Sequence, residues 1–86
     1  KHGINGLTRY VSTYWADKNV RCNSICPGGV FNNQSEDFLE KVSKLIPLGR
    51  MAEKDELNGI IIYLLSEASS YVNGSIINID GGRTSW

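Results

Sequence analysis

The sequence predicts an α/β fold in which two strands lie parallel in one sheet and helices connect them. Apolar residues recur at helical spacing in three segments, residues 4–18, 35–46 and 54–66. Two short runs, 20–26 and 75–80, have the alternation or β-branched content of strands. The connection between these strands is about fifty residues long and contains helices, which favours a right-handed crossover between parallel neighbours. Two strands are too few to form a stable sheet alone, so we expect further strands from a preceding segment or another chain.

The composition is that of a globular chain rather than a disordered one. The 86 residues are 41% hydrophobic and 21% charged, and nine Lys and Arg balance nine Asp and Glu. The zero net charge argues against nucleic acid or a membrane surface as partner, because both attract a basic excess. The longest apolar run, 59–65, is far too short to span a bilayer. The chain opens on Lys1 without a Met, so we expect a fragment or processed piece of a longer protein.

Two cysteines, Cys22 and Cys26, lie four residues apart in the first predicted strand. Four extended residues span about 13 Å, whereas a disulfide allows roughly 7 Å between Cα atoms. Zinc is disfavoured because His2 is the one histidine and no second cysteine pair exists. We therefore expect buried free thiols, no metal and a reducing, cytoplasmic setting.

Local signals mark where the elements begin and end. The helix over 4–18 carries one apolar stripe and ends at Lys18-Asn19, where Asn can adopt a left-handed cap. Pro27 has no N–H and is expected to end the ladder of hydrogen bonds along the first strand. Ser35 can cap the second helix, and residues 47–56 read as a loop. The stripe of the first helix consists of Ile4, Leu7, Val11 and Tyr14 or Trp15. The stripe of the third helix consists of Leu57, Ile60, Ile61, Leu64 and Leu65.

Three glycine positions have a structural meaning that the sequence leaves partly open. Gly59 inside the third helix indicates either close packing or an exposed position. Asn73-Gly74 predicts a turn before the second strand. Gly28, with Gly29, follows Pro27 at the carboxyl end of a strand, where open parallel sheets bind ligands. That bare backbone is either a loop that faces a cofactor or an ordinary strand-ending turn.

Four motifs in order resemble the C-terminal half of the short-chain dehydrogenase/reductase family. The segment KHGINGLTR is similar to the helix that begins at the Lys of the family's Tyr-x-x-x-Lys motif, and VRCNSICPGGV to its next strand and Pro-Gly loop. PLGRMAEKDEL is similar to its Pro-Leu-Gly-Arg segment, and SSYVNGSIINIDGG to its last strand. The resemblance implies the C-terminal portion of a Rossmann-like doubly wound parallel sheet. Residues 1–86 would be the C-terminal fragment of a single NAD(P)-binding domain, with residues 31–53 as its substrate lid and loop region.

The resemblance also implies an oxidoreductase that moves a hydride between the nicotinamide of NAD or NADP and a carbonyl or alcohol carbon. Lys1 would be the catalytic lysine, which contacts the nicotinamide ribose and lowers the pKa of a tyrosine four residues earlier. Pro27 and Gly28 would lie along the nicotinamide. The backbone of Val30 would pair with its carboxamide. Asn32 stands where the family often has Thr, and its amide could still bind the carboxamide or the pyrophosphate.

The substrate side of the resemblance rests on the segment 31–46, the family's variable lid. Gly29 and Phe31 would contact a small-molecule substrate. The polar mouth Asn32-Asn33-Gln34 favours a sugar-like substrate, and the alternative is a solvated loop.

The sequence contains neither a Gly-rich phosphate loop nor the Tyr of the Tyr-x-x-x-Lys motif. We therefore expect the 86-residue chain alone to be inactive. The alternative is a non-catalytic oligomerisation module of the same fold, because apolar aromatic residues on the first helix and at the C-terminus suit subunit contacts. In either case incomplete edges and helix faces favour a homo-oligomer.

Overall fold

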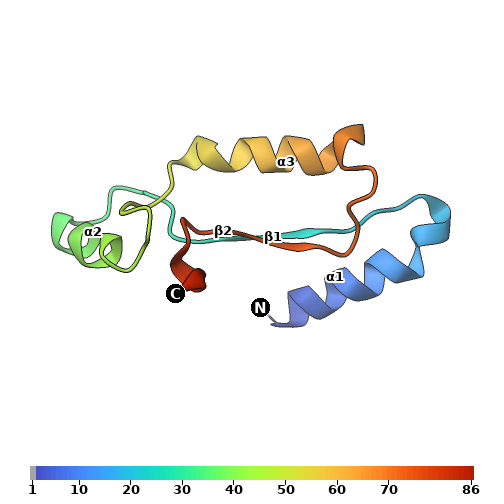
Figure 1. Ribbon diagram of the computed structural model, residues 1–86, viewed down its shortest axis with the longest axis horizontal. Coiled ribbons are helices and arrows are strands. Elements are labelled where there is room, and N and C mark those ends of the chain that lie inside the picture. The colour runs from blue at the N-terminus through green and yellow to red at the C-terminus, as the bar shows by residue number, and fades with distance from the viewer. Residues whose placement is uncertain (1) are drawn as a thin grey trace. The chain divides into compact units, whose positions relative to one another are not determined.

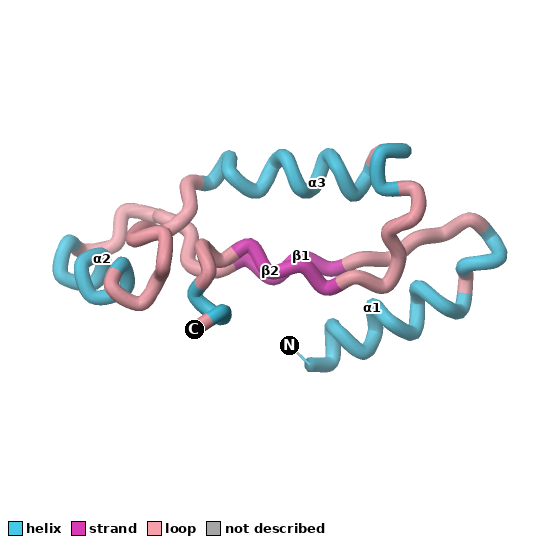
Figure 2. Tube along the Cα trace, viewed as in Figure 1, coloured by secondary structure: helices cyan, strands magenta, loops and turns pink. Residues whose placement is uncertain are grey.

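The computed structural model describes residues 2–86, so Lys1 lies outside the described residues. Figure 1 shows the main elements in chain order: α1 (His2–Tyr14), β1 (Ser24–Pro27), α2 (Glu36–Ser43), α3 (Asn58–Leu65) and β2 (Ile76–Ile79). Short 3-10 helices occur at Ala16–Lys18, Lys54–Leu57, Glu67–Ser69 and Arg83–Ser85, and Figure 2 shows how loops connect all these elements. The predicted order of helix, strand, helix, helix and strand is confirmed.

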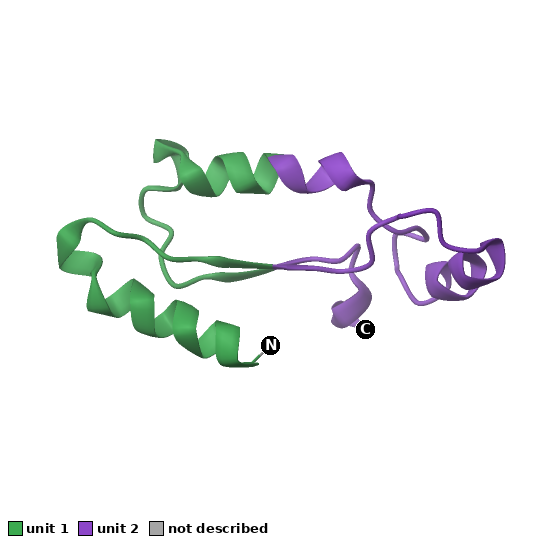
Figure 3. Cartoon of the chain, turned by 180° about the vertical axis from the view of Figure 1, so that it is seen from behind, with its two compact units in different colours: residues 1–25, 59–77 green, residues 26–58, 78–86 purple. Residues whose placement is uncertain are grey.

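The chain divides into two compact units, which Figure 3 shows in different colours. The first contains residues 1–25 and 59–77, and the second contains residues 26–58 and 78–86. The first unit holds α1 and most of α3. The second holds α2, the Pro-Gly loop and the C-terminal tail.

The two strands pair in parallel, as the sequence predicts. The N–H of Ser24 donates to the C=O of Ser75 at 2.9 Å, and the N–H of Gly28 donates to the C=O of Ile79 at 2.9 Å. Each acceptor lies 51 residues after its donor, and this constant offset is the register of parallel strands.

The first strand is shorter than the predicted 20–26. The side chain of Asn23 takes the place of ladder bonds before Ser24: its Nδ2 donates to the C=O of Val72 at 3.0 Å, and its Oδ1 accepts the N–H of Ser75 at 2.9 Å. A side-chain amide competes with the backbone for the same partners, so regular backbone pairing begins only at Ser24.

Pro27 does not end the pairing, and that expectation was wrong. It is the last residue of β1, and the ladder continues to the N–H of Gly28. Ser24 and Gly28 both donate toward the second strand, and successive residues face alternate edges, so the nitrogen of Pro27 faces the opposite edge, where it removes no bond to β2.

Helix α1 buries a different face from the one that its apolar stripe indicates. It ends at Tyr14, and a 3-10 turn continues to Lys18 before Asn19 adopts the expected left-handed conformation at φ 61°. The buried residues are Thr8 and Ser12, at 4% and 5% exposure. The stripe residues Leu7 and Tyr14 remain about three-fifths exposed, at 60% and 59%. Small side chains allow close approach, so the packed face is the one with small polar residues.

The loop before β2 connects α1 to the start of β1. Asn73 accepts the N–H of Cys22 at 3.0 Å through Oδ1 and donates to the C=O of Ser12 at 2.8 Å through Nδ2. Gly74 follows with φ 77°, and a Cβ there would lie 2.9 Å from the Ser12 Oγ. The expected change of direction at Asn73-Gly74 is therefore present, and both residues hold α1 in place.

Helix α3 begins at Asn58, four residues later than the predicted start, because a 3-10 turn precedes it. Glu53 and Glu56 form a capping box around that turn, in which each side chain accepts the backbone N–H of the other residue. The acidic residues thus act as caps at the start of the helical segment. On the predicted apolar face, Leu57, Ile60 and Leu64 are half-buried, whereas Ile61 and Leu65 are exposed.

Replacement of Gly59 by Ala is expected to stabilise the protein by about 0.5–1 kcal/mol, because Ala restricts the unfolded chain and favours helix. A Cβ built on Gly59 has no atom within 4 Å, so the position is exposed rather than closely packed. Urea unfolding of the Gly59→Ala variant would measure the change. A lower midpoint than that of the unmodified protein would contradict the assignment.

The second unit contains a strand-like contact that the sequence reasoning missed. Residues 47–56 were expected to be a loop, but Val30 and Ala52 form a parallel bridge. The N–H of Phe31 donates to the C=O of Ala52 at 2.8 Å, and the N–H of Ala52 donates to the C=O of Gly29 at 3.0 Å. The Ser35 cap is confirmed, because its Oγ accepts the N–H of Phe38 at 3.3 Å.

Candidate functional site

The Pro-Gly loop leaves the carboxyl end of β1 beside the carboxyl end of β2. Gly28 donates to the C=O of Ile79, and a Cβ on Gly28 would lie 2.8 Å from the Cβ and 2.9 Å from the Cα of Asp80. Real Cβ atoms do not come so close to backbone, so only glycine fits at this position. The end of the second strand therefore fixes the path of the loop.

The bridge to Ala52 does not use the backbone N–H and C=O of Val30. It uses the C=O of Gly29 and the N–H of Phe31, so the N–H and C=O of Val30 point away from Ala52. The C=O of Val30 accepts Nε2 of Gln34 at 3.1 Å. Val30 thus presents a donor and an acceptor side by side, the pattern that a planar amide can pair with.

Gln34 closes the loop on itself, which the sequence reasoning did not anticipate. Its Oε1 accepts the N–H of Asn32 at 2.7 Å, while its Nε2 donates to Val30. Asn33 between them adopts φ 57°, a left-handed conformation that Asn tolerates better than most residues. The sequence signal for this turn is the Asn-Asn-Gln run itself, since Asn and Gln side chains can pair with nearby backbone groups.

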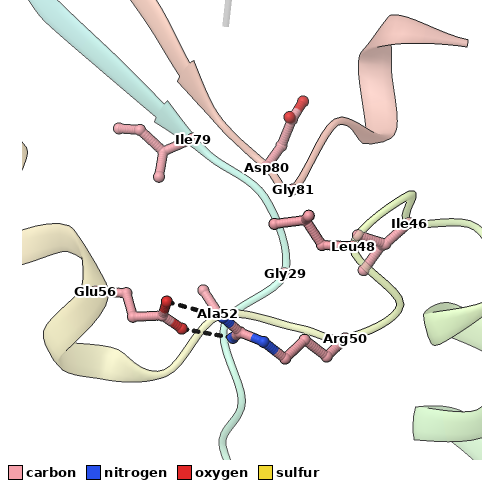
Figure 4. Close-up of a pocket in the computed structure, with 9 residues that line it drawn as sticks. All are labelled: Gly29, Ile46, Leu48, Arg50, Ala52, Glu56, Ile79, Asp80 and Gly81. Atoms are coloured by element: carbon pink, nitrogen blue, oxygen red, sulfur yellow. Dashed lines mark hydrogen bonds and ion pairs between the residues drawn. The ribbon is translucent and has the colours of Figure 1, made fainter.

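A cavity of about 120 Å³ lies under the loop in the second unit (Figure 4). Glycine backbone and apolar side chains form most of its wall, and the Arg50–Glu56 ion pair closes one side. Its lining residues are Gly29, Ile46, Leu48, Arg50, Ala52, Glu56, Ile79, Asp80 and Gly81.

The ion pair joins the Pro-Leu-Gly-Arg segment to the cap of the next helix. Arg50 donates to Glu56 through both guanidinium nitrogens, at 2.6 Å and 3.0 Å. The side-chain hydrogen bond from Arg50, followed by the backbone N–H of Glu53, lowers the pKa of Glu56 to about 2. The same hydrogen bond and the charge of Glu56 raise the pKa of Arg50.

Glu56 is expected to make the stability of the protein depend on pH in the acid range. Its folded pKa of about 2 lies below the ordinary value of 4.5, so its stabilising effect is complete above pH 4.5 and is lost as the pH falls toward 2. The Glu56→Gln variant should therefore unfold at a lower temperature than the unmodified protein at neutral pH, with the difference shrinking toward pH 2. Thermal unfolding across that range measures it, and Glu40→Gln, in an exposed pair with Lys44, is the control. A difference independent of pH would contradict the assignment.

Asp80 follows β2 and organises the chain after it. Its Oδ2 accepts the hydroxyl of Thr84 at 2.6 Å, and its Oδ1 accepts the N–H of Gly82 at 3.0 Å. The hydrogen bond from Thr84, together with the backbone N–H groups of Gly82 and Thr84, lowers the pKa of this carboxyl. In Figure 4 the carboxylate points away from the cavity, so its role there is to shape the turn.

The residues expected to bind cofactor and substrate lie in one continuous loop of the second unit, apart from Lys1, which is outside the described residues. Gly28, Gly29, Val30 and Phe31 are half-buried, and Pro27 and Asn32 are exposed. Cys22 and Cys26 are free and half-buried, whereas the sequence predicted buried thiols. Within residues 2–86 there is no group of three or more possible metal ligands. No helix of this part of the chain has the length and hydropathy to cross a membrane.

Comparisons with known proteins match almost the whole chain. The model of a family described as enoyl-(acyl carrier protein) reductase matches residues 1–84. A tropinone reductase homolog of Arabidopsis thaliana is 37% identical over 90 residues, which cover 98% of this chain and 34% of the relative. The 2-dehydro-3-deoxy-D-gluconate 5-dehydrogenase of Bacillus subtilis is 36% identical over 88 residues, which cover 95% of this chain and 35% of the relative. The chain thus spans about a third of the length of these curated relatives.

A solved structure supports the same assignment. The short-chain dehydrogenase of Leptospira borgpetersenii, determined with bound NAD+, is 43% identical and superposes with a TM-score of 0.92. The match covers 96% of this chain and 33% of that one. The predicted fold, the C-terminal portion of a Rossmann-like doubly wound parallel sheet, is confirmed. This chain belongs to the short-chain dehydrogenase/reductase family.

Proposed function

We propose that this chain is the C-terminal part of an NAD- or NADP-dependent oxidoreductase, which transfers a hydride between nicotinamide and a carbonyl or alcohol carbon. The observation that carries the proposal is the loop from Pro27 to Val30. It lies at the carboxyl ends of both strands, has no side chain at Gly28 or Gly29, and turns the amide-pairing groups of Val30 away from Ala52. The NAD+ bound to the Leptospira relative supports the same cofactor class.

The residues of the loop fit a nicotinamide. A flat ring can lie against the exposed ring of Pro27 and against the side of Gly28 that does not pack on Asp80. The carboxamide would pair with the N–H and C=O of Val30, and Asn32 would offer a further amide. When bound, the nicotinamide supplies the hydride acceptor or donor. The chain's own residues hold its ring, and Lys1 is proposed as the cation beside the ribose and the acid/base tyrosine.

The substrate is proposed to lie between this loop and the lid. Gly29 and Phe31 would contact it, and residues 31–53 would cover it. The exposed amides of Asn32 and Asn33 favour a polyhydroxylated, sugar-like molecule, since amides pair with hydroxyl groups in both directions. The name of the Bacillus subtilis relative, which acts on a gluconate derivative, supports this substrate class.

Steady-state assays of the whole protein test the proposal. Sugar acids, polyols and cyclic alcohols would be offered with NAD+ and, separately, with NADP+, and formation of reduced nicotinamide would be followed by absorbance. Turnover with one of the cofactors is expected. The 86-residue chain alone is expected to show none, because its sequence has no Gly-rich phosphate loop and no Tyr-x-x-x-Lys tyrosine. No binding of either dinucleotide by the whole protein would overturn the proposal.

Gln34 is expected to pre-organise the cofactor loop. Replacement by Ala removes the bonds to Val30 and Asn32, and one net hydrogen bond of about 1 kcal/mol corresponds to roughly fivefold weaker binding of the dinucleotide. Titration of the whole protein with NAD(H) measures the change. The control is Gln34→Glu, which keeps the acceptor for Asn32 but loses the donor to Val30. Unchanged affinity in Gln34→Ala would show that the loop keeps its shape without Gln34.

We also propose that the protein forms a homo-oligomer in the cytoplasm. Ile4, Leu7 and Tyr14 of the apolar stripe of α1 are exposed. The ring of Tyr14 stacks on that of Tyr10 with 5.4 Å between ring centroids and meets the ring of Trp15 edge-on with 4.6 Å between centroids. Aromatic residues of this kind are enriched in subunit interfaces. This surface also supports the second candidate function, a non-catalytic assembly module. Light scattering of the whole protein tests the assembly, and a monodisperse monomer would contradict it. Assembly without dinucleotide binding would favour the module.

A further inference from the structure

The C-terminal tail folds back onto the segment that follows α2. The N–H of Leu48 donates to the C=O of Gly81 at 3.1 Å. At the very end of the chain, Nε1 of Trp86 donates to the C=O of Leu45 at 3.3 Å. The two bonds tie the tail to the first and last residues of the segment 45–48, and both lie within the second unit.

Two glycines make this contact close. A Cβ on Gly81 would lie 2.8 Å from Cγ2 of Ile46, and one on Gly82 would lie 3.0 Å from Cγ of Pro47. Both glycines have positive φ, 64° and 91°, which other residues rarely adopt. Ile46 is among the most buried residues of the chain, at 4% exposure. The first residues of the tail, Gly81 and Gly82, are therefore packed against the segment, whereas residues 83–86 are exposed.

Asp80 fixes the turn that directs the tail backward. Its carboxylate binds the hydroxyl and N–H of Thr84 and the N–H of Gly82. The same residue packs on Gly28 of the Pro-Gly loop. One short stretch at the end of β2 thus contacts the candidate cofactor loop on one side and carries the tail on the other.

We propose that residues 80–86 form a latch that holds residues 45–48, and through them the α2 part of the segment 31–46, in a defined position. The assignment of 31–46 as a substrate lid rests on the proposed function, whereas the contact between tail and segment does not. Thr84 and Trp86 are positioning residues: neither is expected to touch substrate, and both act through the segment that they hold.

Loss of the latch is expected to change substrate binding but not dinucleotide binding. Its loss frees the lid, so the Michaelis constant for the substrate rises, while the dissociation constant for the dinucleotide stays the same because the loop from Pro27 to Val30 keeps its own bonds to β2 and Ala52. A change in general folding would move both constants.

Hydrogen exchange and kinetics on the whole protein test the latch with Thr84→Val, Thr84→Ser and Trp86→Phe. Val removes the hydroxyl that binds Asp80, Ser retains it, and Phe removes the N–H that binds Leu45. In Thr84→Val and Trp86→Phe, amide exchange over residues 36–48 should be faster and the Michaelis constant about fivefold higher, the loss that corresponds to one hydrogen bond. Thr84→Ser should behave as the unmodified protein.

The outcomes separate the latch from the proposed function. Faster exchange over 36–48 in a protein without oxidoreductase activity would support the latch and overturn the proposed function. Unchanged exchange and an unchanged Michaelis constant in both Thr84→Val and Trp86→Phe would overturn the latch. An equal rise in the dissociation constant for the dinucleotide and in the Michaelis constant for the substrate would also overturn the latch, because the tail would then support the fold in general.

Discussion

Replacement of Arg21 by Met is expected to lower the free energy of unfolding by about 2–4 kcal/mol, since each hydrogen bond to a charged group contributes about 1.5–3 kcal/mol and some of the loss is recovered by water. Arg21 donates through Nη1 to the C=O of Val72 at 3.0 Å. Its Nη2 donates to the C=O groups of Leu64 at 3.1 Å and Ser66 at 3.4 Å. A single guanidinium therefore holds the end of α3 and the loop before β2 against the start of β1.

The charge of Arg21 also suits its position. Leu64 lies in the last turn of α3, where free carbonyl groups and the helix dipole favour a cation. Lys at this position keeps the charge but has one donor centre, so Arg21→Lys should recover only part of the stability.

Urea unfolding of Arg21→Met, Arg21→Lys and the control Arg9→Met measures these effects. Arg9 is exposed on α1, and its side chain makes no hydrogen bond or ion pair within the described residues. We expect the order of stability to be Arg9→Met, then Arg21→Lys, then Arg21→Met. If Arg21→Met and Arg9→Met unfold at the same urea concentration, the three carbonyl contacts do not stabilise the fold.

Replacement of Gly28 by Ala is expected to lower kcat/KM of the whole protein by about 100-fold, because a displacement of roughly 1 Å at a binding loop can cost that much. The added Cβ would overlap both Cα and Cβ of Asp80, so the Pro-Gly loop must move away from β2. This movement would weaken the bond to Ile79 and shift the proposed nicotinamide contacts.

Gly6→Ala provides the matched control, because a Cβ at Gly6 in α1 has no atom within 4 Å. That variant should retain the full kcat/KM and gain helix stability. The dissociation constant for NAD(H) should rise in Gly28→Ala and stay constant in Gly6→Ala. Full activity in Gly28→Ala would mean that the loop does not position the cofactor.

The loop of the candidate site and several element boundaries could be predicted because their signals are local. The Pro-Gly-Gly run, the capping Ser35 and the left-handed Asn19 each depend on residues within a few positions. The parallel pairing followed from the length of the connection alone. These local features do not depend on which other segments pack around them.

The features that sequence reasoning missed depend on contacts between distant residues. The buried face of α1 is set by Asn73 and Gly74, about sixty residues later, which select Ser12 over the apolar stripe. The bridge between Val30 and Ala52 and the bond from Trp86 to Leu45 have no local pattern either. Hydrophobic periodicity indicates that a helix has an apolar face, but it does not indicate which segment packs on that helix.

The position of Pro27 limits the hydrogen bonds that a further strand can make with the edge of β1 that faces away from β2. The backbone groups on that edge belong to residues that alternate with Ser24 and Gly28, so Ile25 offers an N–H there and Pro27 offers none. A strand that pairs along this edge finds a donor at Ile25 and none at Pro27, where only the C=O can form a bond. The proline thus weakens pairing at the carboxyl end of this edge, beside the loop of the candidate site.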